Sequence, residues 1–237
     1  MSLNSPISDS KLDQLIDTVG LTPESRAIDF GCGEGDFLVR LNQASGASCL
    51  GLDKDESLIA AATAKLSDLS GVKIEYRRSD IAALPLDLGL CDLAVCMGAS
   101  HAFSEGEPAY RSALESMQKR LKPNGMILIG EGYWKKKADP EYLEFLGDPV
   151  GIYNSFEGNI SLAAELGLVP LYATQSSLDE WDHFEWNFLL KAEREAISNP
   201  QDEAAQKERD RVRKWNAFYR QYGRSTMGYG HYIFMKE

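Results

Sequence analysis

Long apolar runs are missing from this sequence of 237 residues. None approaches the roughly 18 residues that a helix needs to cross a bilayer, and the N-terminus lacks the basic-then-apolar pattern of a signal peptide. The hydrophobic fraction of 43% is nevertheless ordinary for a globular protein with a sizeable core. We therefore expect a cytoplasmic protein with no membrane partner.

Basic residues are also scarce, because 25 Lys and Arg stand against 36 Asp and Glu, for a formal net charge of −11. A surface that binds nucleic acid needs clustered Lys and Arg. The only basic run is Lys135-Lys136-Lys137, which is typical of a solvated loop. We expect no nucleic-acid partner and no polyanionic substrate, which leaves a small molecule or a peptide side chain. The oligomeric state stays open.

Cysteine is limited to four residues, with no CxxC pair and no His at ligand spacing. A zinc or other metal site is therefore not expected. Cys49, Cys91 and Cys96 lie in apolar segments, where buried reduced thiols are common. Cys32 lies inside a glycine-rich turn, which favours a small residue without requiring thiol chemistry.

The first half of the chain alternates short apolar segments with amphipathic ones. This alternation predicts a parallel sheet wound in α/β fashion. The segment "LKPNG" at 121–125 predicts the end of a helix and a turn. Strands are expected at about 26–30, 48–53, 72–77, 91–97 and 126–131, and helices at about 9–19, 35–45, 56–69 and 108–121.

The second half has a different texture. An irregular aromatic insertion at about 132–153 precedes a helix at 155–166, a strand at 168–174, two long helices at about 177–197 and 201–222, and a last strand at 229–235. Aromatic residues recur at helical spacing in both long helices, which we interpret as core or as a cap over a site. We expect one domain over 1–237, with a core of about 20–131, 154–175 and 228–237 and insertions at 132–153 and 177–222.

Three alternate glycines stand in "AIDFGCGEGDF", between a predicted strand and a predicted helix. Glycines at Gly31, Gly33 and Gly35 let backbone N–H groups approach a ligand at the open end of a helix. The spacing is GxGxG, whereas the dinucleotide fingerprint is GxGxxG. Alone, this turn is equally compatible with a tight strand-to-helix connection that holds no ligand.

Two carboxylates at the next strand ends favour a ligand. Asp53 ends the second strand, beside the first turn in this winding, where it can accept hydrogen bonds from both hydroxyls of a ribose. Asp80 follows the third strand, where it and the amide of Ile81 can bind an adenine edge. Each Asp alone is more often a turn or cap residue.

These segments together resemble the class I S-adenosylmethionine-dependent methyltransferases. The segments that match are "AIDFGCGEGDF", "GLDKD", "RRSDIAALPLD", "CDLAVCMGASHAF" and "LKPNGMILIGEGYW", over about residues 24 to 131. The resemblance implies a doubly wound, mainly parallel, seven-stranded Rossmann-like sheet with an antiparallel last strand and a helical cap insertion. It also implies S-adenosyl-L-methionine as the cofactor, and it favours a small-molecule acceptor.

The same resemblance assigns residues to the cofactor. The acid in the first strand, Asp29, would help to hold the amino group of its methionine portion, and the glycine turn would lie against that portion. Asp53 matches the family's ribose acid, and Asp80 with Ile81 matches its adenine contact. The full set expected at the cofactor is Asp29, Gly31, Cys32, Gly33, Gly35, Asp53, Lys54, Asp80, Ile81 and Gly98.

Candidates for catalysis and for the acceptor belong at the carboxyl ends of the fourth and fifth strands. His101, in "MGASHAF", and Glu131, in "GEGYW", are candidate general bases and acceptor ligands. Tyr133 and Trp134 are candidates for an aromatic wall around the acceptor. Each candidate has an alternative interpretation. His101 can be a loop residue that hydrogen-bonds the backbone, and Glu131 can cap a neighbouring loop. Tyr133 and Trp134 can simply pack the insertion.

Two other functions remain compatible with the sequence. The protein is expected to catalyse in-line methyl transfer, but a non-catalytic module that binds S-adenosylmethionine would share the same cofactor residues. An NAD-dependent oxidoreductase is a further alternative, weakened by the absence of a Tyr-x-x-x-Lys pair.

Overall fold

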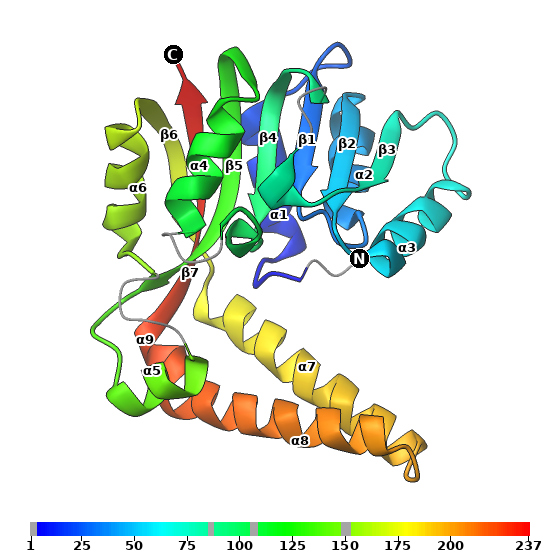
Figure 1. Ribbon diagram of the computed structural model, residues 1–237, viewed down its shortest axis with the longest axis vertical. Coiled ribbons are helices and arrows are strands. Elements are labelled where there is room, and N and C mark those ends of the chain that lie inside the picture. Colours follow the sequence, from blue (N-terminus) through cyan, green and yellow to red (C-terminus); the bar gives the residue numbers. More distant parts are fainter. Residues whose placement is uncertain (1–3, 85–87, 105–108, 148–152) are drawn as a thin grey trace.

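The computed structural model describes residues 4–84, 88–104, 109–147 and 153–237. Their strands form one seven-stranded sheet in the order β3-β2-β1-β4-β5-β7-β6 (Figure 1). The first five strands pair in parallel, and β7 runs antiparallel to both neighbours. The strands are β1 (Arg26–Phe30), β2 (Ser48–Asp53), β3 (Ile74–Arg78), β4 (Cys91–Met97), β5 (Leu121–Trp134), β6 (Leu168–Gln175) and β7 (Met227–Lys236).

Helices cover both faces of this sheet, as its continuous apolar strands require. On one face, α1 (Asp9–Val19) and α2 (Asp36–Ser45) pack against alternate residues of the strands, including Ala27 and Val95. On the other face, α4 (Ala109–Gln118) and α6 (Phe156–Glu165) pack against the intervening residues, including Ile28 and Phe30. The helix α3 (Glu56–Leu66) lies against β2 and β3. The sheet is therefore buried on both sides, and its strand ends are left for a site.

The segment "LKPNG" lies within β5 instead of forming a turn ahead of it. Cys91 of β4 pairs with Leu121, and Leu93 pairs with Met126, so residues 122–125 bulge opposite Asp92. Asn124 has a φ of 61° in this bulge. A helix does end before this segment, since α4 stops at Gln118. The residues predicted to form a turn belong to β5, because they lie within its pairing with β4.

Strand β5 also continues beyond the predicted end at Glu131. It pairs with β7 as far as Trp134, opposite Met227. A short helix, α5 (Pro140–Leu146), then occupies part of the segment predicted to be irregular. Residues 148–152 of that segment lie outside the described residues.

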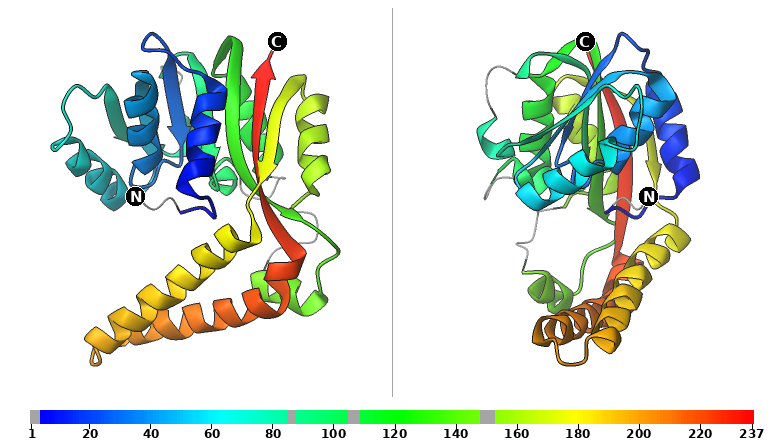
Figure 2. Two further views of the ribbon diagram at one scale, coloured as in Figure 1. Left: turned by 180° about the vertical axis from the view of Figure 1, so that it is seen from behind. Right: turned by 90° about the vertical axis from the view of Figure 1, so that its right-hand side faces the viewer.

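Two long helices project from the sheet beyond the carboxyl ends of its parallel strands (Figures 1 and 2). They are α7 (Leu178–Ser198) and α8 (Glu203–Phe218), which pack against each other as a hairpin. A π-helical turn over Tyr219–Gly223 and the short helix α9 (Arg224–Thr226) lead from α8 into β7. No helix among the described residues is long and apolar enough to span a membrane.

Candidate active site

The glycine turn lies where β1 ends, beside the carboxyl end of β2. The backbone N–H groups of Gly31 and Cys32 both donate to the carbonyl of Leu52, at 2.8 and 3.0 Å. Gly31, Gly33 and Gly35 have φ values of 86°, 53° and 76°, the left-handed region that favours glycine. The turn is thus fixed to β2 by backbone hydrogen bonds.

The three glycines have different neighbours. A Cβ on Gly31 would lie 2.3 Å from the Cβ of Ala99, and a Cβ on Gly35 would lie 2.2 Å from the hydroxyl of Tyr76. That hydroxyl donates to the Gly35 carbonyl at 2.8 Å. A Cβ on Gly33 would meet no atom within 4 Å. Protein packing therefore accounts for Gly31 and Gly35, and Gly33 alone faces open space.

Asp29 is buried in the middle of the sheet, with 2% of its surface exposed. Its Oδ1 has no hydrogen-bond partner among the described residues. Burial, and then the charge of Asp53, raise the pKa of its carboxyl to about 8. A buried carboxyl group without a partner is costly, and a ligand ammonium group would supply the missing donor and charge.

The carboxylate of Asp53 is held in place by two backbone N–H groups. Gly33 donates to Oδ2 and Asp55 donates to Oδ1, each at 3.0 Å. Each oxygen keeps a second lone pair, so the carboxylate can still accept hydrogen bonds from a diol. The backbone N–H of Ser79 donates to the Asp53 carbonyl at 2.8 Å, which brings the exit of β3 to the exit of β2.

Asp80 begins a short 3₁₀ turn over Ile81–Ala83. Its Oδ1 accepts from the backbone N–H of Ala82 at 3.0 Å, and the side chain of Ile81 is buried. Lys54 directly follows β2 and Gly98 directly follows β4, and both residues are exposed. Cys32 is buried, and burial first, then the charges of Asp29 and Asp53, raise the pKa of its thiol, which therefore stays protonated.

These features fit the cofactor that the resemblance implies. The unpartnered Asp29 carboxyl suits its ammonium group, the open space at Gly33 admits its amino-acid portion, and Asp53 presents acceptors for its ribose hydroxyls. Among the described residues, no cluster of His, Cys, Asp and Glu could hold a metal ion.

A cavity of about 490 Å³ lies between this edge of the sheet and the two projecting helices. We call it the cap cavity. Gly98, Ser100, His101 and Glu131 line it from the sheet side. Its cap side includes Trp181, Phe184, Glu185, Trp215 and Tyr219.

Glu131 is buried at the carboxyl end of β5, with 7% of its surface exposed. Its Oε1 accepts from the backbone N–H of Gly132 at 2.8 Å, and Oε2 has no well-aligned partner among the described residues. Burial raises the pKa of Glu131 to about 7, although the Ser100 hydroxyl and the Gly132 N–H oppose the shift. At neutral pH this carboxyl can therefore either give or take a proton.

His101 lies in the 3₁₀ turn Ser100–Ala102, which follows β4, and its side chain is exposed at the same cavity. The turn sits next to β5 because the backbone N–H of Gly98 donates to the Gly130 carbonyl at 3.0 Å. The structure thus brings His101 and Glu131 to one cavity.

Tyr133 and Trp134 lie elsewhere. They line a second, open hollow of about 650 Å³ together with Ser155 and Thr174. The Tyr133 ring occupies the space above Gly228, where a Cβ would lie 2.2 Å away. The described structure therefore does not place these two side chains in the cap cavity, and their role as an acceptor wall stays a prediction.

Sequence reasoning missed Glu185 as a site residue. It is 5% exposed and accepts a hydrogen bond from the indole of Trp215 at 2.9 Å. The signal was available, because Glu185 falls four residues after Trp181 on the apolar stripe of its helix. A carboxylate on such a stripe is uncommon and calls for a partner. Trp181 and Trp215, which the sequence assigns more readily to a core, also line the cap cavity.

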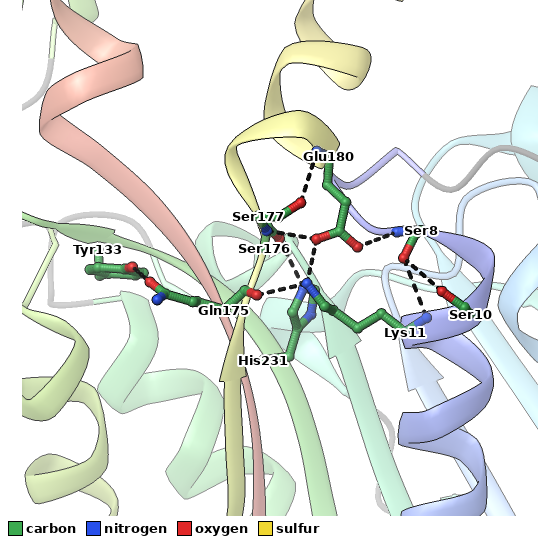
Figure 3. Close-up of polar contacts among 9 residues, drawn as sticks. All are labelled: Ser8, Ser10, Lys11, Tyr133, Gln175, Ser176, Ser177, Glu180 and His231. Atoms are coloured by element: carbon green, nitrogen blue, oxygen red, sulfur yellow. Dashed lines mark hydrogen bonds and ion pairs between the residues drawn. The ribbon is translucent and has the colours of Figure 1, made fainter.

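A polar network joins the cap to the N-terminal segment (Figure 3). Lys11 of α1 forms an ion pair with Glu180 of α7 and donates to the Gln175 carbonyl at 2.7 Å. Beneath it, Ser176 and Nε2 of His231 lie 3.1 Å apart. Burial, and then the charge of Lys11, lower the pKa of His231 to about 3, so this imidazole is neutral and acts as a core residue.

Comparison with known families matches residues 27–125 to the family described as "Methyltransferase domain". The chain is 25% identical over 231 residues to the uncharacterized protein YjhP of Escherichia coli K12, covering 96% of this chain and 91% of that protein. It is 31% identical over 106 residues to a demethylmenaquinone methyltransferase of Lactococcus lactis, covering 44% of this chain and only 40% of that enzyme.

Two solved structures share the whole architecture. The X-ray structure of YjhP from E. coli superposes with a TM-score of 0.88 at 24% identity, over 99% of this chain and 95% of that one. A SAM-dependent methyltransferase from Geobacter sulfurreducens, in complex with S-adenosyl-L-homocysteine, also gives 0.88 at 24% identity, over 100% and 94% of the two chains. The predicted doubly wound sheet with an antiparallel last strand is confirmed.

Proposed function

We propose that this chain, whose residues 27–125 match the methyltransferase domain family, is a class I S-adenosylmethionine-dependent methyltransferase that methylates a small-molecule acceptor bound in the cap cavity. The observation that carries this proposal is the buried carboxyl of Glu131, a residue that lines that cavity. The volume of about 490 Å³ lies within the range of small-molecule sites.

The cofactor residues have distinct tasks in this proposal. Asp29 holds the ammonium group of the cofactor, Gly33 leaves room for its amino-acid portion, and Asp53 orients its ribose. Asp80 and the amide of Ile81 bind its adenine edge. When bound, S-adenosyl-L-methionine supplies an electrophilic methyl group on a neutral, good leaving group.

The remaining residues position the acceptor and move its proton. In-line displacement requires the acceptor atom to be aligned and water to be excluded, which the aromatic walls of the cap cavity favour. Glu131 takes the proton that the acceptor loses, since its carboxyl titrates close to neutral pH. His101, exposed at the same cavity, orients the acceptor or relays that proton.

Calorimetric titration with S-adenosylhomocysteine, followed by assays with methyl-labelled cofactor against a panel of metabolites, tests the proposal. We expect micromolar binding and label transfer to at least one small molecule. A protein that binds the cofactor product but labels no acceptor would be the non-catalytic module. The buried acid at the cap cavity favours the enzyme over that module, because cofactor binding alone gives Glu131 no task.

A further inference from the structure

Two buried carboxyl groups line the cap cavity from opposite elements. Glu131 lies in β5 of the sheet, three residues before its end, and Glu185 lies on α7 of the cap. Their exposed fractions are 7% and 5%. A cavity lined by two buried carboxyl groups favours ligands that can interact with both of them.

No Lys or Arg side chain lines this cavity among the described residues. The residues outside the described ranges, 1–3, 85–87, 105–108 and 148–152, contain no Lys or Arg in the sequence either. An acceptor that carries a phosphate or carboxylate group would therefore meet two acids and, among the described lining residues, His101 but no Lys or Arg, which disfavours such acceptors.

Neither acid is paired with a Lys or Arg side chain in the described part of the cavity wall. Glu185 accepts from the neutral indole of Trp215 at 2.9 Å, and Glu131 from the backbone of Gly132 at 2.8 Å. Burial raises the pKa of each carboxyl to about 7. Two buried carboxylates without a cation are costly, so a cationic ligand is favoured over a neutral one of the same shape.

The walls between the two acids are largely aromatic. Tyr142, Phe145, Trp181 and Tyr229 are among the lining residues. Aromatic faces attract ammonium groups, and the attraction is stronger when the cation is desolvated. The same rings exclude water from the carboxyl groups and so strengthen their attraction for a cation.

Building on the proposed function above, we propose that the methyl acceptor is a small amine, cationic in solution, whose nitrogen is held between Glu131 and Glu185. The ammonium gives one proton to the Glu131 carboxylate. The freed lone pair on nitrogen forms the new bond to the methyl carbon, and the electron pair of the methyl–sulfur bond goes to sulfur. The product is the methylated ammonium, and Glu131 releases its proton to solvent.

Binding of a matched pair of probes tests the charge preference without turnover. Choline carries a quaternary nitrogen where 3,3-dimethylbutan-1-ol carries a carbon of the same shape. With the protein saturated in S-adenosylhomocysteine at pH 8.5, we expect choline to quench tryptophan fluorescence with about tenfold higher affinity than the alcohol. Equal binding of the two probes, or no saturable choline binding at millimolar concentration, would overturn the proposal.

Isosteric variants test whether Glu131 and Glu185 cause the preference for choline over the alcohol. Glu131→Gln and Glu185→Gln should each reduce choline affinity about fivefold or more and leave binding of the alcohol unchanged. The matched control is Glu208→Gln, at an exposed position on α8 that pairs with Arg211, and it should behave as wild type. A choline preference that persists in both cavity variants would contradict the assignment.

Methylation assays with different acceptor classes distinguish failure of this inference from failure of the proposed function. Labelled cofactor is offered with panels of primary and secondary amines, of phenols and alcohols, and of phosphorylated or carboxylated compounds. Methylation of amines, with a lower kcat/KM in Glu185→Gln, supports the inference. Methylation confined to the other panels would leave the enzyme function intact and refute the amine. No methylation in any panel would refute both.

Discussion

The carboxylate of Glu180, in the first turn of α7, accepts a hydrogen bond from the backbone N–H of Ser8 at 2.8 Å, across 172 positions of sequence. The same carboxylate accepts from the backbone N–H of Ser177 at 2.6 Å and pairs with Lys11. Two residues that precede Ser8, Asn4 and Pro6, line the cap cavity. The N-terminal segment is therefore fixed to the cap at the point where both border the cap cavity.

This attachment predicts an acid-sensitive contribution to stability. Burial alone would raise the pKa of Glu180, but hydrogen bonds from Lys11 and Ser8 lower it to about 2. A lowered pKa means that this contribution is present above about pH 4.5 and is lost as the pH falls towards 2. Glu180→Gln should therefore remove about 1–3 kcal/mol of unfolding free energy at pH 6 and little at pH 2.

Urea unfolding at several pH values measures this difference. Hydrogen exchange at the start of α7 should also be faster in Glu180→Gln than in wild type, because the helix loses its tie to the N-terminal segment. The exposed Glu208→Gln serves as the control. The prediction fails if the wild type and Glu180→Gln lose the same free energy of unfolding on acidification.

Gly33→Ala should fold with little loss of stability but should bind the cofactor more weakly. Its φ of 53° makes Gly33→Ala cost about 1 kcal/mol of stability. The added Cβ points into the space that the cofactor would occupy, so affinity for S-adenosylhomocysteine should fall about tenfold or more. Gly71→Ala is the matched control, since its φ is 73° and its Cβ also meets no atom within 4 Å. Equal calorimetric affinities of the two variants would contradict the placement.

Asp29→Asn should weaken cofactor binding and alter the pH dependence of stability. Loss of a charged hydrogen bond to the ammonium group should lower affinity for S-adenosylhomocysteine about 10- to 100-fold. Because the pKa of Asp29 is raised to about 8, its stabilising contribution declines as the pH rises from 4 to 8. The wild type should lose several kcal/mol more than the variant between pH 5 and 9. Denaturant titrations at these two pH values would show parallel losses if the carboxyl already has a partner.

Glu131→Gln should slow methyl transfer about 10²- to 10⁴-fold and leave affinity for S-adenosylhomocysteine unchanged. In the wild type, kcat should rise with pH through about 7, since the carboxyl must lose its proton before it can act as a base. That rise should disappear in the variant. If kcat rose with pH in the same way in the wild type and in Glu131→Gln, the general base would be another group.

His101→Ala should leave both the fold and cofactor binding intact, because the side chain is exposed and lies in a short turn. If His101 orients the acceptor, KM for the acceptor should rise. If it relays a proton, kcat should fall. Initial-rate kinetics with the identified acceptor would remove His101 from the site if neither constant changed.

The strands that carry the cofactor residues were predictable because their apolar runs are continuous and end at charged or glycine residues. The predicted bounds of β1, β2 and β4 are those of the structure. Such strands are buried on both faces, so local composition is enough to locate them. Asp29 and Asp53 follow from the bounds of β1 and β2 by position alone. Asp80 follows β3, which begins two residues later and ends one residue later than predicted.

Other features depend on contacts that no local pattern contains. The need for glycine at Gly31 and Gly35 arises from Ala99 and Tyr76, which come from distant parts of the chain. The bulge in β5 reflects its pairing with β4. Glu185 joins the site only because the helix hairpin places α7 opposite the sheet edge. For this reason the residues proposed for the cofactor can be selected from the sequence more readily than those that line the cap cavity.

The residues that fit the methyl donor and those that form the cap wall lie in separate stretches of the chain. Residues that fit the methyl donor all precede Ala99, whereas much of the opposite wall of the cap cavity is encoded in one uninterrupted stretch between β6 and β7. Recombination at the two ends of that stretch can replace most of this wall as a unit. A lineage can thereby acquire a new acceptor while it keeps an ancestral donor site unchanged.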